Sequence, residues 1–262
     1  MFDSGFGGLT VARAVIDLLP GEDLVYVGDT GRYPYGPRPL AEVRGFACQI
    51  GRYLVGDEGV KLVVVACNTA AAAGPDLEAV LDVPVVGVIE PGVRAVVQAT
   101  TSGRVGVIGT VGAIRSGAYQ EAVAATGSGV ELTCAACPGF VEFVERGETQ
   151  SDQVHVLAER LLAPLVEAKV DSLLLGCTHY PYLARTISDV VGRDVVLVSS
   201  ADETAFEVRR LLHGSDNAAP DRDRSARHRF LSSGDTSQFS VLGGRLLGPE
   251  LASADPVPWS EP

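Results

Sequence analysis

Two cysteines stand at the ends of two similar apolar runs. Cys67 ends "KLVVVAC" and is followed by Asn68, whereas Cys177 ends "DSLLLGC" and is followed by Thr178 and His179. Polar groups and a helix start beside a thiol favour the thiolate, which is the form that accepts a proton. With two such groups on opposite faces of one ligand, one can remove a proton from a carbon while the other returns a proton from the far side. The pair therefore predicts an enzyme that inverts a stereocentre.

The same two cysteines allow three other interpretations. Both could be small buried hydrophobic residues, the two could form a disulfide across a cleft, or one could be a nucleophile with His179 as its base. The matched surroundings of the thiols argue against the first interpretation and a cytosolic location argues against the second. The third leaves one thiol without a role.

The other cysteines indicate no disulfide framework and no metal site. Cys134 and Cys137 form a C-x-x-C pair, and Cys48 lies alone. A zinc site would need a second pair, or histidines at a matching spacing, and the sequence has neither. We therefore expect Cys134 and Cys137 to be structural thiols.

Short apolar runs alternate with longer amphipathic stretches along the chain. The runs are continuous rather than alternating, which is typical of strands buried on both faces of a parallel sheet. The amphipathic stretches between them have helical periodicity. The sequence therefore predicts an α/β fold, with strands at 24–28, 61–66, 83–89, 104–109, 171–176 and 194–200.

A faint internal duplication divides the chain into two halves. When the two cysteines are superposed, "VVVACNTA" lies over "LLLGCTHY" and "VVGVIE" lies over "VVLVSS". We therefore expect two similar open, mainly parallel-sheet lobes related by pseudo-symmetry, with the active site in the cleft between them. The Pro-Gly break at 90–95 is the expected boundary. The first lobe would comprise 1–92 plus 205–262, with the C-terminal segment packing back, and the second lobe 93–204.

Composition and charge exclude several classes of function. The chain has 262 residues, a net charge of −12 and no basic run, which disfavours binding to nucleic acid or to an anionic membrane. No apolar run approaches the roughly 20 residues of a membrane helix. We expect a cytoplasmic protein with a small-molecule substrate.

The lysines and glycines argue against two common cofactors. Pyridoxal phosphate needs a Schiff-base lysine, yet Lys61 and Lys169 both precede their strands, at the end opposite the expected cleft. The segment "DSGFGG" lacks the full spacing of a dinucleotide-binding fingerprint. The sequence therefore predicts a reaction without a cofactor.

Four motifs in this order carry a family resemblance. "FDSGFGGLTV", "ACNTA", "GCTHYP" and "SSGD" closely resemble the bacterial glutamate racemases, the cofactor-independent two-cysteine branch of the aspartate/glutamate racemase superfamily. The resemblance extends nearly end to end. It implies the interconversion of L- and D-glutamate, a supply of D-glutamate for cell-wall peptidoglycan, and a homodimer.

The resemblance also implies roles for individual residues. Cys67 would act on D-glutamate with help from Asp3, and Cys177 on L-glutamate with help from His179. Two further acidic positions near the site would be Asp29 and Glu145. The implied substrate contacts are Asp3, Ser4, Pro34, Tyr35, Gly36, Asn68, Thr69, Thr110, Thr178 and His179. Hydroxyl and backbone N–H groups of this kind bind carboxylates well. Alternatively, the two acids could be ordinary surface or cap residues, and "YPYGPR" could be only a turn.

The sequence departs from the family pattern at two places. The family usually has a second hydroxyl three residues after Thr110, and Ala113 stands there, so we expect one carboxylate contact to be missing. Only Met1 and Phe2 precede Asp3, where the family has a full apolar strand. We expect the natural chain to begin several residues earlier.

Two competing functions remain at this stage. One is a racemase for another acidic substrate such as aspartate, which the residues by themselves do not separate from glutamate. The other is a binding protein that has kept the fold and lost the chemistry, which the presence of both cysteines disfavours.

Overall fold

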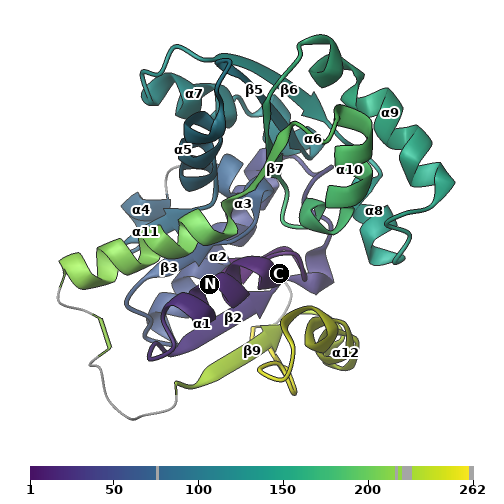
Figure 1. Cartoon of the computed structure of the whole chain (residues 1–262). Helices are drawn as coiled ribbons and strands as arrows, with labels where there is room; N and C mark the ends of the chain where they lie inside the picture. Colours follow the sequence, from purple (N-terminus) through teal and green to yellow (C-terminus); the bar gives the residue numbers. More distant parts are fainter. Residues whose placement is uncertain (75–76, 216–217, 220–225, 260–262) are drawn as a thin grey trace.

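The chain folds into two lobes, each built on one parallel sheet (Figure 1). The computed structural model describes residues 1–74, 77–215, 218–219 and 226–259. Every strand pair in these residues is parallel. The predicted α/β class and the two open parallel-sheet lobes are thus confirmed.

The first sheet has the strand order β10-β9-β2-β1-β3-β4. Its strands are β1 Phe2–Asp3, β2 Leu24–Gly28, β3 Val63–Val65, β4 Val85–Gly87, β9 His228–Ser232 and β10 Asp255–Pro256. β1 has only two residues, yet it lies in the centre of the sheet, where Phe2 is fully buried and pairs with Val27 and Val65. This short strand is what brings Asp3 to the carboxyl edge of the sheet.

The second sheet repeats the order of four strands of the first. Its order is β6-β5-β7-β8, with β5 Arg104–Gly109, β6 Glu131–Ala136, β7 Ser172–Gly176 and β8 Val196–Ser199. The order β2-β1-β3-β4 in the first lobe therefore corresponds to β6-β5-β7-β8 in the second. In this correspondence β3 is equivalent to β7, so Cys67 and Cys177 follow equivalent strands.

Helices cover both faces of each sheet. Those of the first lobe are α1 Leu9–Leu18, α2 Leu40–Gly56, α3 Asn68–Ala72, α4 Leu77–Val80, α11 Ser200–Gly214 and α12 Thr236–Leu247, with the 3-10 turn η1 Thr30–Arg32. Those of the second are α5 Ile89–Ala99, α6 Val111–Arg115, α7 Ala118–Ala125, α8 Phe140–Glu145, α9 Asp152–Glu167 and α10 Ala184–Val191, with η2 Tyr180–Leu183. Among the helices in the described part of the chain, none has both the length and the apolar character to cross a membrane.

The strands are buried on both faces, as their continuous apolar runs predict. Leu173 and Leu174 are neighbours on β7, and both are fully buried. Leu173 packs among residues of α9 and α10, whereas Leu174 packs among residues of α5 and α7. The first sheet is likewise covered by α1, α11 and α12 on one face and by α2 and α3 on the other.

The Pro-Gly stretch expected at the boundary between the lobes forms part of a helix. Pro91 and Gly92 lie inside α5, within its first turns. Proline is tolerated there because the first N–H groups of a helix have no intrahelical partner. The expected boundaries after residues 92 and 204 therefore fall inside α5 and α11. The chain passes between the sheets before each of these helices begins.

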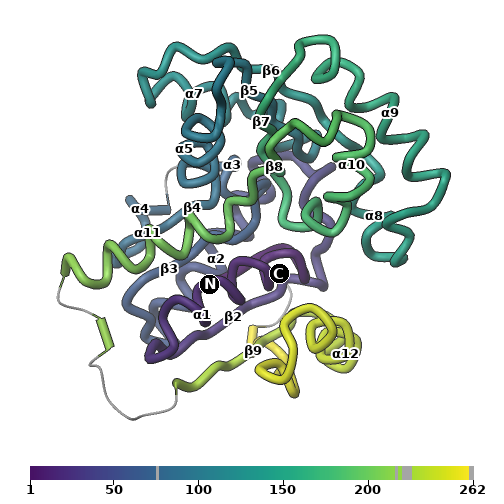
Figure 2. The backbone as a smooth tube through the Cα atoms, in the orientation of Figure 1, coloured from purple at the N-terminus to yellow at the C-terminus, as the bar shows by residue number. Residues whose placement is uncertain are grey.

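The local sequence pattern does not predict β6. It predicts that the C-terminal segment packs back on the first lobe, but it does not predict that β9 is a strand. β9 pairs with β2 along its whole length and so extends the first sheet, as the tube in Figure 2 also shows. This pairing adds residues 228–232 to the first sheet. The polar stretch before these residues falls partly on 216–217 and 220–225, outside the described residues.

Hydrogen bonds join the two lobes where the carboxyl ends of their strands face each other. The hydroxyl of Tyr119 on α7 accepts a bond from the amide of Asn68 at 3.0 Å and donates to the carbonyl of Gly176 at 3.1 Å. Thr69 and Thr110 share a bond of 2.9 Å between their hydroxyls. These contacts set the distance between the lobes at this edge.

We expect Tyr119→Phe to destabilise the fold. The substitution leaves the Asn68 amide and the Gly176 carbonyl without a buried partner, at a cost of about 1–3 kcal/mol. Thermal unfolding should show a melting temperature several degrees lower. Tyr182→Phe is the matched control, because the Tyr182 hydroxyl has no hydrogen bond within the described residues. Equal melting temperatures for wild type and Tyr119→Phe would contradict the assignment.

Candidate active site

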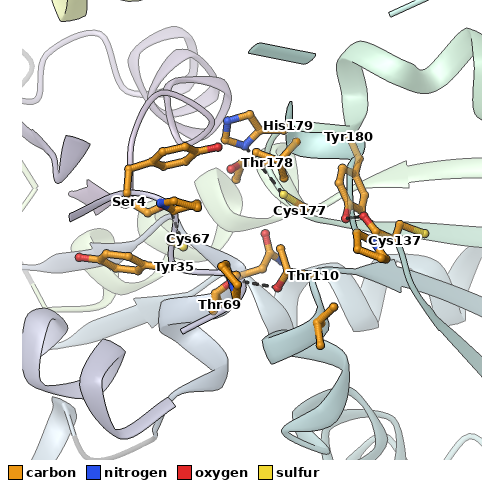
Figure 3. A pocket seen from close by; sticks show the side chains of 18 of the residues that line it. Ser4, Tyr35, Cys67, Thr69, Thr110, Cys137, Cys177, Thr178, His179 and Tyr180 are labelled. Atoms are coloured by element: carbon orange, nitrogen blue, oxygen red, sulfur yellow. Dashed lines mark hydrogen bonds between the residues drawn. The ribbon is translucent and has the colours of Figure 1, made fainter. Parts of the chain in front are cut away.

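One buried cavity lies between the two lobes, at the carboxyl ends of both sheets (Figure 3). It offers about 100 Å³ to water-sized molecules, which suits a small metabolite rather than a polymer. Most residues that the sequence assigned to the site line this cavity: Asp3, Ser4, Pro34, Tyr35, Gly36, Cys67, Asn68, Thr69, Thr110, Cys177, Thr178 and His179. The cavity is therefore where the predicted site residues meet.

Cys67 enters the cavity from the first lobe, between β3 and α3. Its side chain is 5% exposed, and its Sγ lies 3.7 Å from the Ser4 hydroxyl. Burial raises the pKa of Cys67 to about 12, and the nearby Asp3 carboxyl contributes to the rise. Hydrogen bonds from Ala70 and Ser4 oppose the shift. At neutral pH this sulfur is therefore a thiol, which can donate a proton.

Cys177 enters from the second lobe at the equivalent place, after β7. Its Sγ lies 3.8 Å from Nδ1 of His179, and both side chains are buried. Burial by itself lowers the pKa of His179, but the contact with the Cys177 sulfur and the ion pair with Glu145 outweigh it and raise the pKa to about 10. His179 is thus an imidazolium at neutral pH, and its positive charge lies next to the sulfur of Cys177.

Glu145 stands behind His179, not in the cavity. Its Oε1 lies 3.6 Å from Nε2 of His179, which is an ion-pair distance but long for a hydrogen bond. Nε2 accordingly has no hydrogen-bond partner in the described residues, although it is buried. Glu145 is absent from the cavity lining, so it acts on the site through His179.

Asp3 stands beside both halves of the cavity. Its Oδ1 accepts a hydrogen bond of 2.7 Å from the backbone of Gly5, and its Oδ2 lies 3.5 Å from the hydroxyl of Thr178 in the other lobe. Burial raises the pKa of Asp3, and the charge of His179 opposes this rise. The lobes approach closely here, because a Cβ at Gly7 would come within 2.6 Å of the His179 ring.

Small polar side chains also line the cavity. The hydroxyls of Ser4, Thr69 and Thr178 are buried, and each can donate to a carboxylate. Asn68 donates its amide hydrogen to Tyr119, while its Oδ1 is buried without a hydrogen-bond partner among the described residues. Such an acceptor suits an ammonium group. The cavity can thus bind a small molecule that carries both carboxylate and ammonium groups.

Asp29 is not part of the cavity lining. It is fully buried in the first lobe, and its carboxylate accepts hydrogen bonds from Tyr35, Arg32 and Ser233. No face of it is directed to the cavity. It contacts two residues of the cavity lining: its carboxylate accepts from Tyr35, and its backbone N–H donates to the carbonyl of Asp3 at 3.0 Å.

Several lining residues were missed by the sequence analysis. They are Tyr33, Pro37, Val111, Cys137, Pro138, Gly139, Val141, Glu142 and Tyr180. Cys137 directly follows β6, the strand that the sequence analysis did not recognise. Had β6 been identified, its carboxyl end would have placed Cys137 at this edge. Cys134 lies on the strand itself and is half-buried.

Three other expectations concern residues outside the cavity. Ala113 is fully buried in the core of the second lobe and does not line the cavity. Lys61 and Lys169 are likewise absent from the lining, and Lys61 pairs with Glu22 at 2.7 Å. The described residues contain no cluster of acidic, histidine and cysteine side chains that could hold a metal ion.

Comparison with known protein sequences points to one family. The family model for Asp/Glu/hydantoin racemases matches residues 10–207. A glutamate racemase of a Parafrankia species is 53% identical over 264 residues, covering 100% of this chain and 95% of the relative. That of Acidothermus cellulolyticus is 54% identical over 252 residues, covering 96% of this chain and 95% of the relative.

Solved structures agree with the sequence comparison. A glutamate racemase isoform from Bacillus anthracis has a TM-score of 0.91 at 39% identity, covering 99% of this chain and 96% of that one. Glutamate racemase from Francisella tularensis, in complex with D-glutamate, has a TM-score of 0.89 at 31% identity, covering 98% and 95%. The chain therefore belongs to the Asp/Glu/hydantoin racemase family, and within it to the glutamate racemases.

Proposed function

We propose that the chain interconverts L- and D-glutamate by moving the α-proton between two thiols, Cys67 and Cys177. The observation that carries the proposal is the placement of these sulfurs after equivalent strands of two lobes, on one shared cavity. Neither sulfur is in a disulfide. A reaction that works on both faces of one carbon needs this arrangement.

The two thiols have neighbours of opposite charge. Burial raises the pKa of Cys67, and the nearby carboxyl of Asp3 adds to the rise, so this sulfur stays protonated. Cys177 lies beside the imidazolium of His179, which stabilises a thiolate. We therefore assign the role of acid to the thiol of Cys67 and the role of base to the sulfur of Cys177 beside the imidazolium.

In the direction from L-glutamate, the thiolate of Cys177 takes the α-proton. The electron pair of the broken C–H bond moves into the α-carboxylate, and the carbon becomes planar. The thiol of Cys67 then donates its proton to the opposite face, which yields D-glutamate, a thiolate at Cys67 and a thiol at Cys177. The reverse direction starts from that second protonation state, so proton exchange with Asp3, His179 and solvent must restore the first.

Support for glutamate as substrate comes from the relatives and from the polar lining. The relatives named above are glutamate racemases, and one of them was solved in complex with D-glutamate. The hydroxyls of Ser4, Thr69 and Thr178 offer donors to carboxylates, and Oδ1 of Asn68 offers an acceptor to the ammonium. We further propose that the D-glutamate serves the synthesis of bacterial cell-wall peptidoglycan.

Replacing either Cys67 or Cys177 by Ala should abolish racemisation in both directions. Each direction needs one base and one acid, so the loss should be several orders of magnitude. Circular dichroism of L- and of D-glutamate solutions measures it directly. Cys48→Ala and Cys134→Ala are matched controls, because neither side chain lines the cavity. Near-normal racemisation by Cys67→Ala would refute the two-thiol mechanism.

Glu145→Gln should move the alkaline limb of the pH–rate profile to lower pH. The carboxylate of Glu145 helps to hold the pKa of His179 at about 10, and an amide does not favour the imidazolium. His179 would then lose its proton at a lower pH, and the thiolate of Cys177 would lose its counterion.

For a partly exposed carboxylate the expected displacement of this limb is about one pH unit. It is read from kcat/KM for L-glutamate across the neutral and alkaline range. Glu148→Gln, on an exposed residue paired with Arg146, is the control and should leave the profile in place. A profile unchanged by Glu145→Gln would exclude this role.

The enzyme should discriminate against aspartate. A site that binds both carboxylates of glutamate cannot place both carboxylates of aspartate correctly, because the aspartate side chain is one methylene shorter. The expected cost is roughly 1–3 kcal/mol. This corresponds to a kcat/KM about 10- to 200-fold lower, measured with L-aspartate under the same conditions. Equal turnover of the two amino acids would show that the site does not distinguish glutamate from aspartate by side-chain length.

A further inference from the structure

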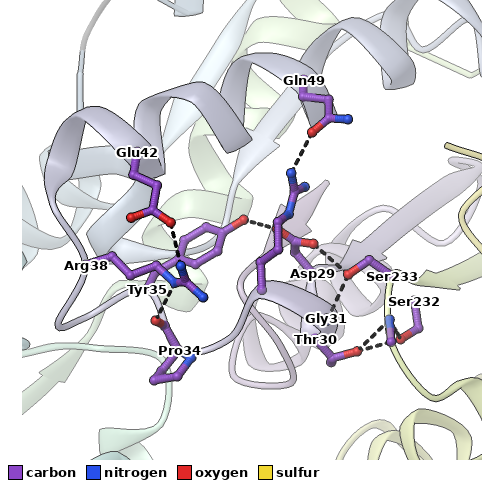
Figure 4. Close-up of polar contacts among 12 residues, drawn as sticks. Asp29, Thr30, Gly31, Pro34, Tyr35, Arg38, Glu42, Gln49, Ser232 and Ser233 are labelled. Atoms are coloured by element: carbon purple, nitrogen blue, oxygen red, sulfur yellow. Dashed lines mark hydrogen bonds and ion pairs between the residues drawn. The ribbon is translucent and has the colours of Figure 1, made fainter. Parts of the chain in front are cut away.

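A buried carboxylate outside the cavity connects three segments of the first lobe (Figure 4). Asp29 follows β2 and is fully buried. Its Oδ2 accepts from the hydroxyl of Tyr35 and from Nε of Arg32 at 2.7 Å, and its Oδ1 accepts from the hydroxyl of Ser233 at 2.6 Å. The same carboxylate thus binds one residue of the cavity lining and one of the C-terminal segment.

Tyr35 belongs to a loop that borders the cavity. Residues 33–37 all contribute to the lining, and the side chain of Tyr35 is 1% exposed. Burial, followed by the charge of Asp29, raises the pKa of Tyr35 far above its ordinary value, so its hydroxyl remains a donor. The next residue, Gly36, accepts a bond of 3.1 Å from the backbone of Gly112 in the other lobe. The hydroxyl of Tyr35 therefore anchors a loop that contacts both the cavity and the second lobe.

Ser233 reaches Asp29 from a segment far away in the sequence. It directly follows β9, and its backbone N–H donates to the carbonyl of Gly28 at 3.1 Å. Its hydroxyl also accepts a bond of 3.0 Å from the backbone of Gly31. The two backbones approach so closely that a Cβ at Gly31 would lie 2.8 Å from the carbonyl oxygen of Ser233. Ser233 thus fixes the side of Asp29 opposite to Tyr35.

We propose that Ser233 is a positioning residue for substrate binding, which acts through Asp29 and Tyr35 on the loop 33–37. The inference rests on the proposed function for its kinetic readout. The described residues of the C-terminal segment contribute no side chain to the cavity lining. Their role in this proposal is to complete the support of the substrate-binding loop.

The neighbouring serine provides a matched control. Ser232 is buried on the same segment, and its hydroxyl lies 2.7 Å from that of Thr30. It has no bond to Asp29 within the described residues. Ser232→Ala and Ser233→Ala remove the same atom from adjacent positions. The Ser233 hydroxyl bonds Asp29 and the backbone of Gly31, whereas the Ser232 hydroxyl bonds Thr30 and the backbone of Gly234, so only Ser233→Ala removes a bond to Asp29.

Ser233→Ala should raise the KM for glutamate about tenfold, with a smaller change in kcat. Tenfold corresponds to about 1.4 kcal/mol, which is the loss expected for one hydrogen bond to a charged group. In a Tyr35→Phe background the same substitution should have almost no further effect on KM, because its route to the loop is already broken. Ser232→Ala should leave KM near the wild-type value.

Two measurements without substrate complete the test. Hydrogen exchange of the peptide that covers 29–38 should be faster in Ser233→Ala than in wild type, and unchanged in Ser232→Ala. Fluorescence of Trp259, the single tryptophan, reports whether the C-terminal segment stays in place, since its ring lies 5.0 Å from that of Tyr53. An unchanged emission spectrum in Ser233→Ala would show that the segment is still docked.

The possible outcomes separate this inference from the proposed function. If the wild type does not racemise glutamate, the proposed function fails, and the exchange measurement still decides on Ser233. Unchanged exchange and KM in Ser233→Ala would overturn the inference. So would an equal effect of Ser232→Ala, or a tenfold rise in KM that persists in the Tyr35→Phe background.

Discussion

The site depends on one constraint, which is that the carboxyl ends of two parallel sheets face each other across one cavity. In a parallel sheet all strands end at the same edge, so residues that follow different strands meet there. Because β3 and β7 occupy equivalent positions in their sheets, the residues after them approach the cavity from opposite sides. This geometry brings the two thiols to one cavity from opposite lobes, which is the arrangement on which the proposed inversion of a stereocentre rests.

The two lobes are similar in topology, yet the surroundings of their thiols differ in charge. Cys67 has the carboxyl of Asp3 and the hydroxyl of Ser4 beside it, whereas Cys177 has the imidazolium of His179. Burial and the Asp3 carboxyl together raise the pKa of Cys67, whereas Cys177 has a positive charge beside it that is poorly screened in the cavity. The fold supplies the symmetry of position, and these neighbours supply an asymmetry of charge.

Contacts across the lobes and within the first lobe hold the lining in place. Tyr119 bridges Asn68 and Gly176, and the backbone of Gly112 meets that of Gly36. The C-terminal segment adds the contact of Ser233 with Asp29 behind the loop 33–37. The positions of the polar lining groups are therefore decided by residues that never reach the cavity, which is the general condition for a preorganised site.

Local sequence was enough to identify the thiols and the class of fold. Continuous apolar runs predict strands buried on both faces, and the repeated pattern around Cys67 and Cys177 predicts their equivalence, because both signals are contained within about ten neighbouring residues. The resemblance to the glutamate racemases supplied most of the lining. Only the tertiary structure could place Asp29 behind Tyr35, bring Cys137 to the cavity, include Pro91 in a helix and join Ser233 to β2. These facts depend on which distant segments pack together, and no local pattern records that.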